Sequence, residues 1–275
     1  MKINRVTHSI RIAVMAAIGL LMSLPLLYLL SSSLMTARDV SAYPPNILPP
    51  TLNFQNYVDA WGYLTPQTFL NSIIFSFGVV ICQAVVGLVA GFALAKVPFR
   101  GATVVLAIFI IPMFLPNNVS IIPIYLIVNS LGLVNTYAGM IIPVVGSTAF
   151  ATLLFRQTFA SLPNEIIEAA RIDGATWSRI LVSIGLPLVL PGVAAYASIT
   201  FVGTWNQYIW PLIVAPSPDL RVLPVALAPL AQSMYQTIPP NVGMAAAVIS
   251  TVPILIIFLA TQKWYVRGIV GTGAD

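Results

Sequence analysis

The charged side chains of this chain, its main candidates for chemistry, gather in one short stretch. Only 7% of the 275 residues are charged, as 12 Lys and Arg and 7 Asp and Glu. Six of these lie between positions 156 and 179: Arg156, Glu165, Glu168, Arg171, Asp173 and Arg179. The lone His8 and lone Cys82 provide neither a metal-ligand set nor a disulfide. We therefore expect whatever this protein does in water to happen in this stretch, with no metal.

Local chemistry predicts a short helix inside the charged stretch. Ser161 or Asn164 is expected to cap its start, and Glu165 and Glu168 place negative charge where the helix dipole favours it. Gly174 permits a left-handed residue that ends the helix and redirects the chain. These signals predict a surface helix of about two to three turns.

The same helix carries small and apolar residues. Ala169 and Ala170 would let another protein approach closely, and Ile166, Ile167 and Ile172 supply apolar surface that needs a cover. We expect this helix to be clamped to the foot of a membrane span.

The rest of the chain is strongly apolar. Hydrophobic residues make up 59% of it, which excludes an ordinary soluble domain and indicates an all-α, polytopic membrane protein. The net charge of +5 comes from basic residues scattered at the ends of apolar stretches, which argues against a nucleic-acid partner. Cys82 lies within an apolar run, where we expect a small core residue.

Apolar runs predict six membrane spans with the charged stretch as the loop 156–179 between the fourth and fifth. The spans are expected at about residues 12–34, 69–94, 102–128, 137–155, 180–202 and 244–262. Loops at 35–68 and 216–242 fall on the opposite side. With both termini on the side of the charged stretch, that side holds ten Lys and Arg, and the other holds Arg38 and Arg221. The positive-inside rule then places both termini in the cytoplasm.

The six apolar cores contain no Asp, Glu, Lys, Arg or His, and the chain has no Walker-type phosphate loop. Proton-driven carriers usually need ionisable groups within the membrane, although sodium coupling through carbonyls and hydroxyls stays open. We expect that if this protein moves a solute uphill, another chain supplies the energy.

Residues 168–174 (EAARIDG) and 184–187 (IGLP) resemble the EAA loop, EAA-x3-G-x9-I-x-L-P, of the membrane subunits of bacterial binding-protein-dependent ABC importers. The longer pattern is similar to the carbohydrate-uptake branch, including maltose-type and glycerol-3-phosphate-type second permease subunits. In that family the loop is a coupling helix that docks in a cleft of the cytoplasmic ATPase. The resemblance assigns this role to Glu165, Glu168, Ala169, Ala170, Arg171, Asp173 and Gly174. Glu168 and Arg171 are also spaced to pair with each other on one helix face.

The resemblance covers nearly the whole chain and implies one transmembrane permease domain, residues 1–275, in the bacterial inner membrane. It implies a heterodimer with a second permease subunit, two ABC ATPase subunits that hold ATP and Mg²⁺, and an extracytoplasmic binding protein, either a lipoprotein or periplasmic. This chain would be a transport subunit embedded in lipid, with no ATPase site and no cofactor of its own.

Two further segments carry the resemblance. Residues 262–274 look like a family C-terminal signature that reaches the ATPases, here through Arg267, Gly268 and Gly271, and the loop 216–242 would meet the binding protein. Residues 205–212 (WNQYIWPL) look like the end of the fifth span.

Aromatic, amide and hydroxyl groups bind sugars, and such residues in this chain are candidates for the solute path. They are Asn117, Asn118, Tyr125, Trp205, Asn206, Gln207, Tyr208 and Trp210. Aromatic residues near an interface can equally form a membrane belt.

The leading interpretation is a permease subunit for a sugar or sugar-like solute. Importers of glycerol-3-phosphate or its diesters are the first alternative, although a phosphate would prefer basic residues or helix N-termini. An ion-coupled secondary carrier and a membrane scaffold or enzyme subunit are alternatives of other classes.

Overall fold

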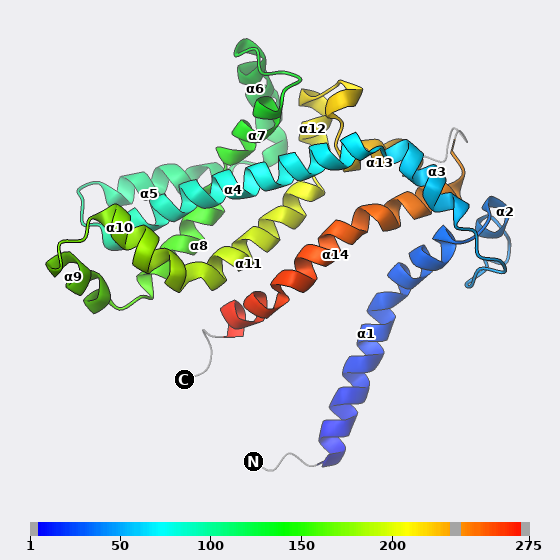
Figure 1. Ribbon diagram of the computed structural model, residues 1–275, viewed down its shortest axis with the longest axis horizontal. Helices are drawn as coiled ribbons and strands as arrows, with labels where there is room; N and C mark the ends of the chain where they lie inside the picture. Colours follow the sequence, from blue (N-terminus) through cyan, green and yellow to red (C-terminus); the bar gives the residue numbers. More distant parts are fainter. Residues whose placement is uncertain (1–4, 232–237, 271–275) are drawn as a thin grey trace. The chain divides into compact units, whose positions relative to one another are not determined.

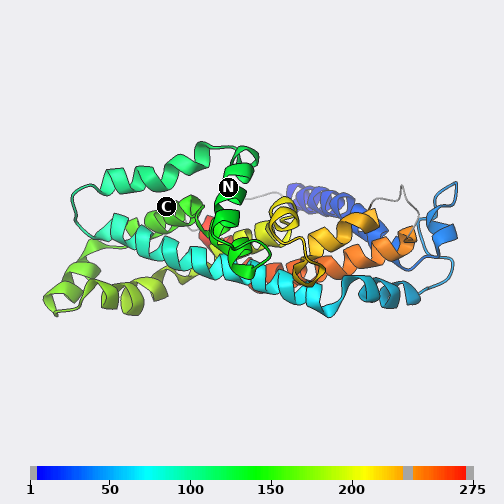
Figure 2. The ribbon, with the colours of Figure 1, turned by 90° about the horizontal axis from the view of Figure 1, so that it is seen from above.

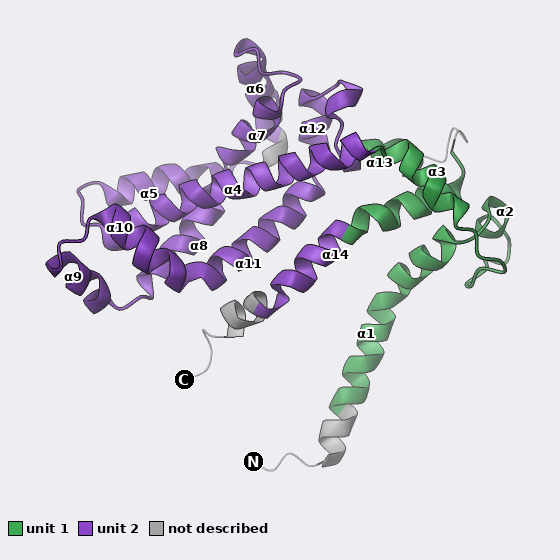
Figure 3. Ribbon diagram, in the orientation of Figure 1, with its two compact units in different colours: residues 1–65, 226–252 green, residues 66–225, 253–275 purple. Residues whose placement is uncertain are grey.

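The computed structural model describes residues 5–231 and 238–270, without the side chains of residues 5–10, 117–118, 231 and 264–270. Across these ranges the chain is helical and contains no strand. It divides into two compact units, residues 1–65 with 226–252 and residues 66–225 with 253–275 (Figure 3). The helical fold predicted from composition is therefore confirmed.

The first unit is organised around a buried amide. Its elements are α1 (Arg5–Ser33), α2 (Ala37–Val40), α3 (Gln55–Leu64) and adjoining parts of α13 (Leu223–Ala231) and α14 (Pro240–Val270). Nδ2 of Asn56 donates to the carbonyls of Ser33 and Met35, both at 2.8 Å. Its Oδ1 accepts from Nδ2 of Asn241 at 2.7 Å. These bonds fasten α3 to the end of α1 and to the start of α14.

The second unit is built on the long helix α4 (Figures 1 and 2). Its elements are α4 (Pro66–Lys96), α5 (Ala102–Ile110), η1 (Ile111–Phe114), α6 (Asn117–Ser130), α7 (Tyr137–Val145), α8 (Ala149–Ala160), α9 (Asn164–Ile172), α10 (Trp177–Ile180), η2 (Leu181–Gly185), α11 (Leu186–Trp205), α12 (Ile209–Val214) and η3 (Pro218–Leu220). A Cβ atom on Gly87 would lie 2.5 Å from Cβ of Ala151, and one on Gly91 would lie 2.7 Å from the backbone nitrogen of Arg156. Helices α4 and α8 thus approach so closely that only glycine fits at these positions.

Four helical stretches are long and apolar enough to cross a membrane: Arg11–Ser33, Pro66–Lys96, Trp177–Trp205 and Pro240–Lys263. Two bent pairs raise the number to six if each pair counts as one span: Ala102–Phe114 with Val119–Ser130, and Tyr137–Val145 with Ala149–Ala160. These stretches fit a polytopic membrane protein, and the count of six stays a prediction.

The third and fourth expected spans, 102–128 and 137–155, are not single helices. The first bends by 111° and the second by 50°. Leu115 and Pro116 have extended backbone at the first break, as a proline and its preceding residue favour. At the second break, Pro143 in the last turn of α7 cannot donate a helical hydrogen bond.

Three local expectations differ from the structure. Cys82 is exposed rather than in the core, because α4 turns Val79 and Gln83 inward on its other side. The loop 216–242 contains α13 in its described part. Neither Ser161 nor Asn164 caps α9: Pro163 holds the N-cap position without a side-chain bond, and Asn164 is the first helical residue.

Candidate functional site

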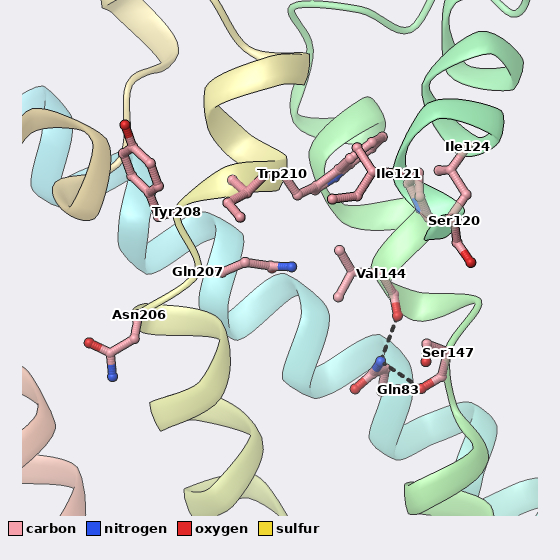
Figure 4. Close-up of a pocket in the computed structure, with 12 residues that line it drawn as sticks. Gln83, Ser120, Ile121, Ile124, Val144, Ser147, Asn206, Gln207, Tyr208 and Trp210 are labelled. Carbon is pink, nitrogen blue, oxygen red and sulfur yellow. Dashed lines mark hydrogen bonds between the residues drawn. The ribbon is translucent and has the colours of Figure 1, made fainter. Parts of the chain in front are cut away.

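A pocket of about 600 Å³ lies in the second unit, between α4, α6, the break between α7 and α8, and the segment after α11 (Figure 4). Its lining combines amide, hydroxyl, aromatic and aliphatic groups: Gln83, Ser120, Ile121, Ile124, Pro143, Val144, Ser147, Asn206, Gln207, Tyr208, Ile209 and Trp210. None of these twelve side chains is acidic or basic. The described wall therefore offers neutral hydrogen bonds and ring faces to a ligand.

Gln83 joins three helices at this pocket and is only 7% exposed. Its Nε2 donates to the carbonyls of Val144, at 2.6 Å, and Ser147, at 3.3 Å (Figure 4). Its Oε1 accepts from the hydroxyl of Tyr196 on α11, at 2.8 Å. Val144 lies in the last turn of α7, and Ser147 lies in the break between α7 and α8. Gln83 thus stabilises the bend and connects it to α11.

The residues directly after α11 point in different directions. In Figure 4 the side chain of Gln207 extends across the opening toward Val144, whereas that of Asn206 points away. Oε1 of Gln207 is buried and has no hydrogen-bond partner among the described residues. Nε1 of Trp210 donates to the carbonyl of Met140 at 3.0 Å, which fixes the indole at the wall. Gln207 is therefore a lining amide whose buried oxygen has no partner in the described part of the chain.

Some of the residues predicted for the solute path line the pocket, and others do not. Of the candidates for the solute path, Asn206, Gln207, Tyr208 and Trp210 line the pocket. Trp205 is outside it, 3% exposed and stacked on Phe201 with ring centroids 5.3 Å apart.

The other candidates for the solute path are not among its lining residues. Tyr125 packs against the apolar cluster around Phe75 and Met140. The side chains of Asn117 and Asn118 lie outside the described residues.

Sequence reasoning missed Gln83, Ser120 and Ser147 as pocket residues. The signal for Gln83 was available, because a long polar amide within an otherwise apolar span is costly to bury without partners. Nothing in the sequence placed Ser120 and Ser147 on one wall, since both depend on the bends that carry α6 and α7.

The charged stretch forms α9 and α10 at the end of the second unit opposite α12 (Figure 1). Helix α9 turns Ile167 and Ala170 into an apolar cluster with Phe155 and Ile180. Its opposite side exposes Glu165, Glu168 and Ala169. Of the two alanines predicted to admit another protein, Ala169 is thus available and Ala170 is used within the chain.

The end of α9 is fixed by its own residues. Gly174 has a φ of +80°, as the sequence predicts for a helix-ending residue. The guanidinium of Arg171 lies 4.7 Å from the ring centroid of Trp177 and donates to the carbonyl of Ala175 at 3.1 Å. Arg171 therefore folds back onto the start of α10, away from the pairing with Glu168 that the spacing allowed. Asp173 is exposed beside it.

The predicted ATPase-contacting tail falls outside the described side chains. Arg267 and Gly268 lie in the last turn of α14, where the structure gives the backbone alone, and Gly271 is beyond the described residues.

Residues 83–271 match the family model of the binding-protein-dependent transport system inner membrane component. The chain belongs to this family. The match begins at Gln83 and contains both the pocket and the charged stretch. It identifies a membrane-spanning permease subunit of an ABC importer, a transport subunit of inner-membrane type. Membership favours this interpretation over a self-sufficient ion-coupled carrier or a scaffold.

Curated relatives match this permease over most of both chains. The sn-glycerol-3-phosphate transport system permease protein UgpE of Agrobacterium fabrum is 31% identical, with 98% of each chain covered. The protein of that name from Escherichia coli O1:K1 is 32% identical over 90% of each chain.

Solved structures share the fold. A chain of a bacterial ABC transporter involved in the import of the acidic polysaccharide alginate superimposes with a TM-score of 0.81 at 23% identity, covering 96% of this permease and 98% of that chain. A chain of an alginate ABC transporter in complex with an alginate pentasaccharide-bound periplasmic protein gives a TM-score of 0.60 at 15% identity.

Proposed function

We propose that this permease is one half of a heterodimeric ABC importer for a neutral, hydroxyl-rich solute, a sugar or a sugar-like compound. The observation that carries the proposal is the uncharged lining of the pocket, with Gln207 and Tyr208 at its opening and Trp210 in its wall. Hydroxyl groups suit amide acceptors such as Gln207, and the faces of sugar rings suit aromatic side chains.

The charged stretch is the proposed site of ATPase coupling. Two ABC ATPase subunits would hold ATP and Mg²⁺ and contact the exposed side of α9, where Glu165 and Glu168 are available to basic groups. Their closure would move α9, and α10 with η2 continues directly into α11. Helix α11 contacts Gln83 through Tyr196 and is followed by Gln207. One helix thus leads from the proposed ATPase contact to the pocket, as alternating access requires.

The other partners follow from topology. Both termini and α9 would face the cytoplasm, which the distribution of Lys and Arg supports. The loop 216–242 would then face a lipoprotein or periplasmic binding protein that delivers the solute. Arg267, Gly268 and Gly271 would approach the ATPases from the C-terminal side. A second permease subunit would complete the solute path, and this chain would bind no cofactor.

Glycerol-3-phosphate or its diesters are a second candidate. The names of the UgpE relatives at about 30% identity support this solute. The pocket of this chain provides no basic side chain for a phosphate, so the second permease subunit or backbone N–H groups would have to bind it.

The test is solute-dependent ATP hydrolysis by the complex purified from its native membrane and reconstituted in vesicles. Binding protein loaded with a sugar should stimulate hydrolysis and uptake of that sugar. Stimulation by glycerol-3-phosphate alone would replace the first candidate with the second. An ion gradient that drives uptake without the ATPase subunits would refute both.

A further inference from the structure

Lys96, the last residue of α4, donates hydrogen bonds to the segment where α9 begins. Its Nζ donates to the carbonyl of Leu162 at 2.7 Å and to Oδ1 of Asn164 at 2.6 Å. These acceptors lie 66 and 68 residues further along the chain. In the sequence, Lys96 is one of the ten basic residues that orient the chain in the membrane. The structure gives it specific partners in addition.

The two bonds supplement apolar packing at the same junction, where Phe92 of α4 and Ile167 of α9 belong to one buried cluster. Asn164 is the first residue of α9, and Pro163 before it provides no side-chain cap. A pocket of about 690 Å³ separates part of α9 from the end of α4, with Lys96, Glu168 and Trp177 in its lining. Hydrogen bonds from an ammonium group are stronger than those between neutral groups. Lys96 therefore adds a charged and directional link between α4 and the beginning of α9.

Helix α4 leads from Lys96 to the solute pocket. Gln83 is thirteen positions before Lys96 on the same helix, a separation of about 20 Å at 1.5 Å per residue. The end of α9 already reaches that pocket along the chain, through α10, η2 and α11. The beginning of α9 reaches it through Lys96 and α4.

We propose that Lys96 is a positioning residue that makes α4 move together with α9 during transport. The inference rests on the proposed contact between α9 and the ATPases. Without the ammonium group, α9 would still receive motion and pass it to α11, but α4 would follow α9 less closely, through apolar contacts and the bond between Tyr196 and Gln83. ATP would then be hydrolysed with less solute moved per cycle.

The experiment compares Lys96→Gln with Arg100→Gln in the complete reconstituted complex. Both substitutions remove one positive charge from the same turn, and Arg100 is exposed, so topology is affected equally. We expect Lys96→Gln to keep ATP hydrolysis and to lower solute transported per ATP by roughly tenfold or more, the scale of a lost bond to a charged group. Arg100→Gln should keep the wild-type ratio, and Lys96→Arg should restore most of it. Equal ratios for Lys96→Gln and Arg100→Gln would overturn the inference.

Two further variants keep the test decisive. Asn164→Ala removes one acceptor and leaves the Leu162 carbonyl, so it should lower the ratio by less than Lys96→Gln does. Glu165→Lys tests the underlying proposal, because Glu165 is exposed on α9 and does not line the pocket that contains Lys96. If Glu165→Lys abolishes stimulation of hydrolysis while Lys96→Gln behaves as wild type, the coupling role stands and the inference about Lys96 fails. If Glu165→Lys has no effect, the coupling role itself fails.

Discussion

Polar side chains at the pocket and on α9 differ in burial and in hydrogen bonding. In the pocket, Gln83 is 7% exposed and all its hydrogen-bonding partners belong to the chain itself. On α9, Glu165 and Glu168 are exposed, and the apolar Ile172 beside them is 86% exposed. A buried amide with complete bonding stabilises one shape, whereas exposed charge next to exposed isoleucine fits a surface that another protein covers. The comparison shows that the hydrogen bonds of Gln83 at the pocket wall are satisfied within this chain. The exposed surface of α9, in contrast, fits a contact with a partner.

The largest effect, on the stability of the fold, is expected at the contact of α4 with α8. These two helices support both the pocket and α9. Leucine at position 91 would overlap the backbone of Arg156, and backbone atoms cannot move aside cheaply. We expect Gly91→Leu to destabilise the permease by about 3 kcal/mol or more, the upper range for overpacked cores. Thermal unfolding of the purified protein measures this. Gly203→Leu is the control, because nothing lies within 4 Å of a Cβ there. Equal stability of the two variants would contradict the tight contact.

The second prediction distinguishes the roles of Gln83 and Gln207, two of the amide side chains that line the pocket. Gln83→Leu removes the bonds to the hydroxyl of Tyr196 and to the carbonyls of Val144 and Ser147, at about 1–3 kcal/mol for each buried group that stays unpaired. The carbonyl of Val144 keeps the backbone N–H of Ser147. Gln207→Leu removes an acceptor that has no partner in the described chain, so stability should change little while the KM for solute rises. Unfolding and uptake measured on both variants test this. A stable Gln83→Leu protein, or an unchanged KM for Gln207→Leu, would remove the distinction.

The third prediction concerns only the end of α9. Valine at position 174 must adopt a φ near +80°, which costs about 1–2 kcal/mol for a residue with a Cβ. We expect Gly174→Val to insert normally and to lower transport per ATP hydrolysed. Gly101→Val imposes similar strain at a φ of +90° in the turn before α5, outside α9 itself. Coupling lost equally in both variants would mean that the strain, and not its place on α9, is responsible.

The smallest effect is expected from two tryptophans, one in each region. Trp210→Phe loses the bond to the Met140 carbonyl, worth about 1 kcal/mol, and should raise the KM modestly. Trp177→Phe keeps an aromatic face under Arg171 and should leave coupling nearly unchanged. Uptake and ATP hydrolysis measured side by side test the pair. The reverse order of effects would contradict the assignment of the two regions.

Local rules predicted the charged stretch in some detail. The position of α9 and the left-handed Gly174 follow from short-range chemistry, and the structure agrees. Of the three isoleucines expected to need a cover, Ile167 is buried, whereas Ile166 and Ile172 are exposed in this chain. The pocket was harder to predict. Asn206, Gln207 and Tyr208 were recognised by residue type, but Gln83 and Ser147 meet only because two expected spans bend. Such bends depend on proline and on bonds between distant helices, so the spacing of apolar residues in the sequence does not predict them.

The most direct test of the account places a photoactivatable residue at Ile172 and irradiates the native complex. The account predicts a covalent adduct with the ATP-hydrolysing subunit. The same probe at Val182, 62% exposed in the first turns of the membrane helix, should give none. An adduct of Ile172 with the binding protein, or equal labelling from both positions, would contradict the claim that α9 receives the motion that drives transport.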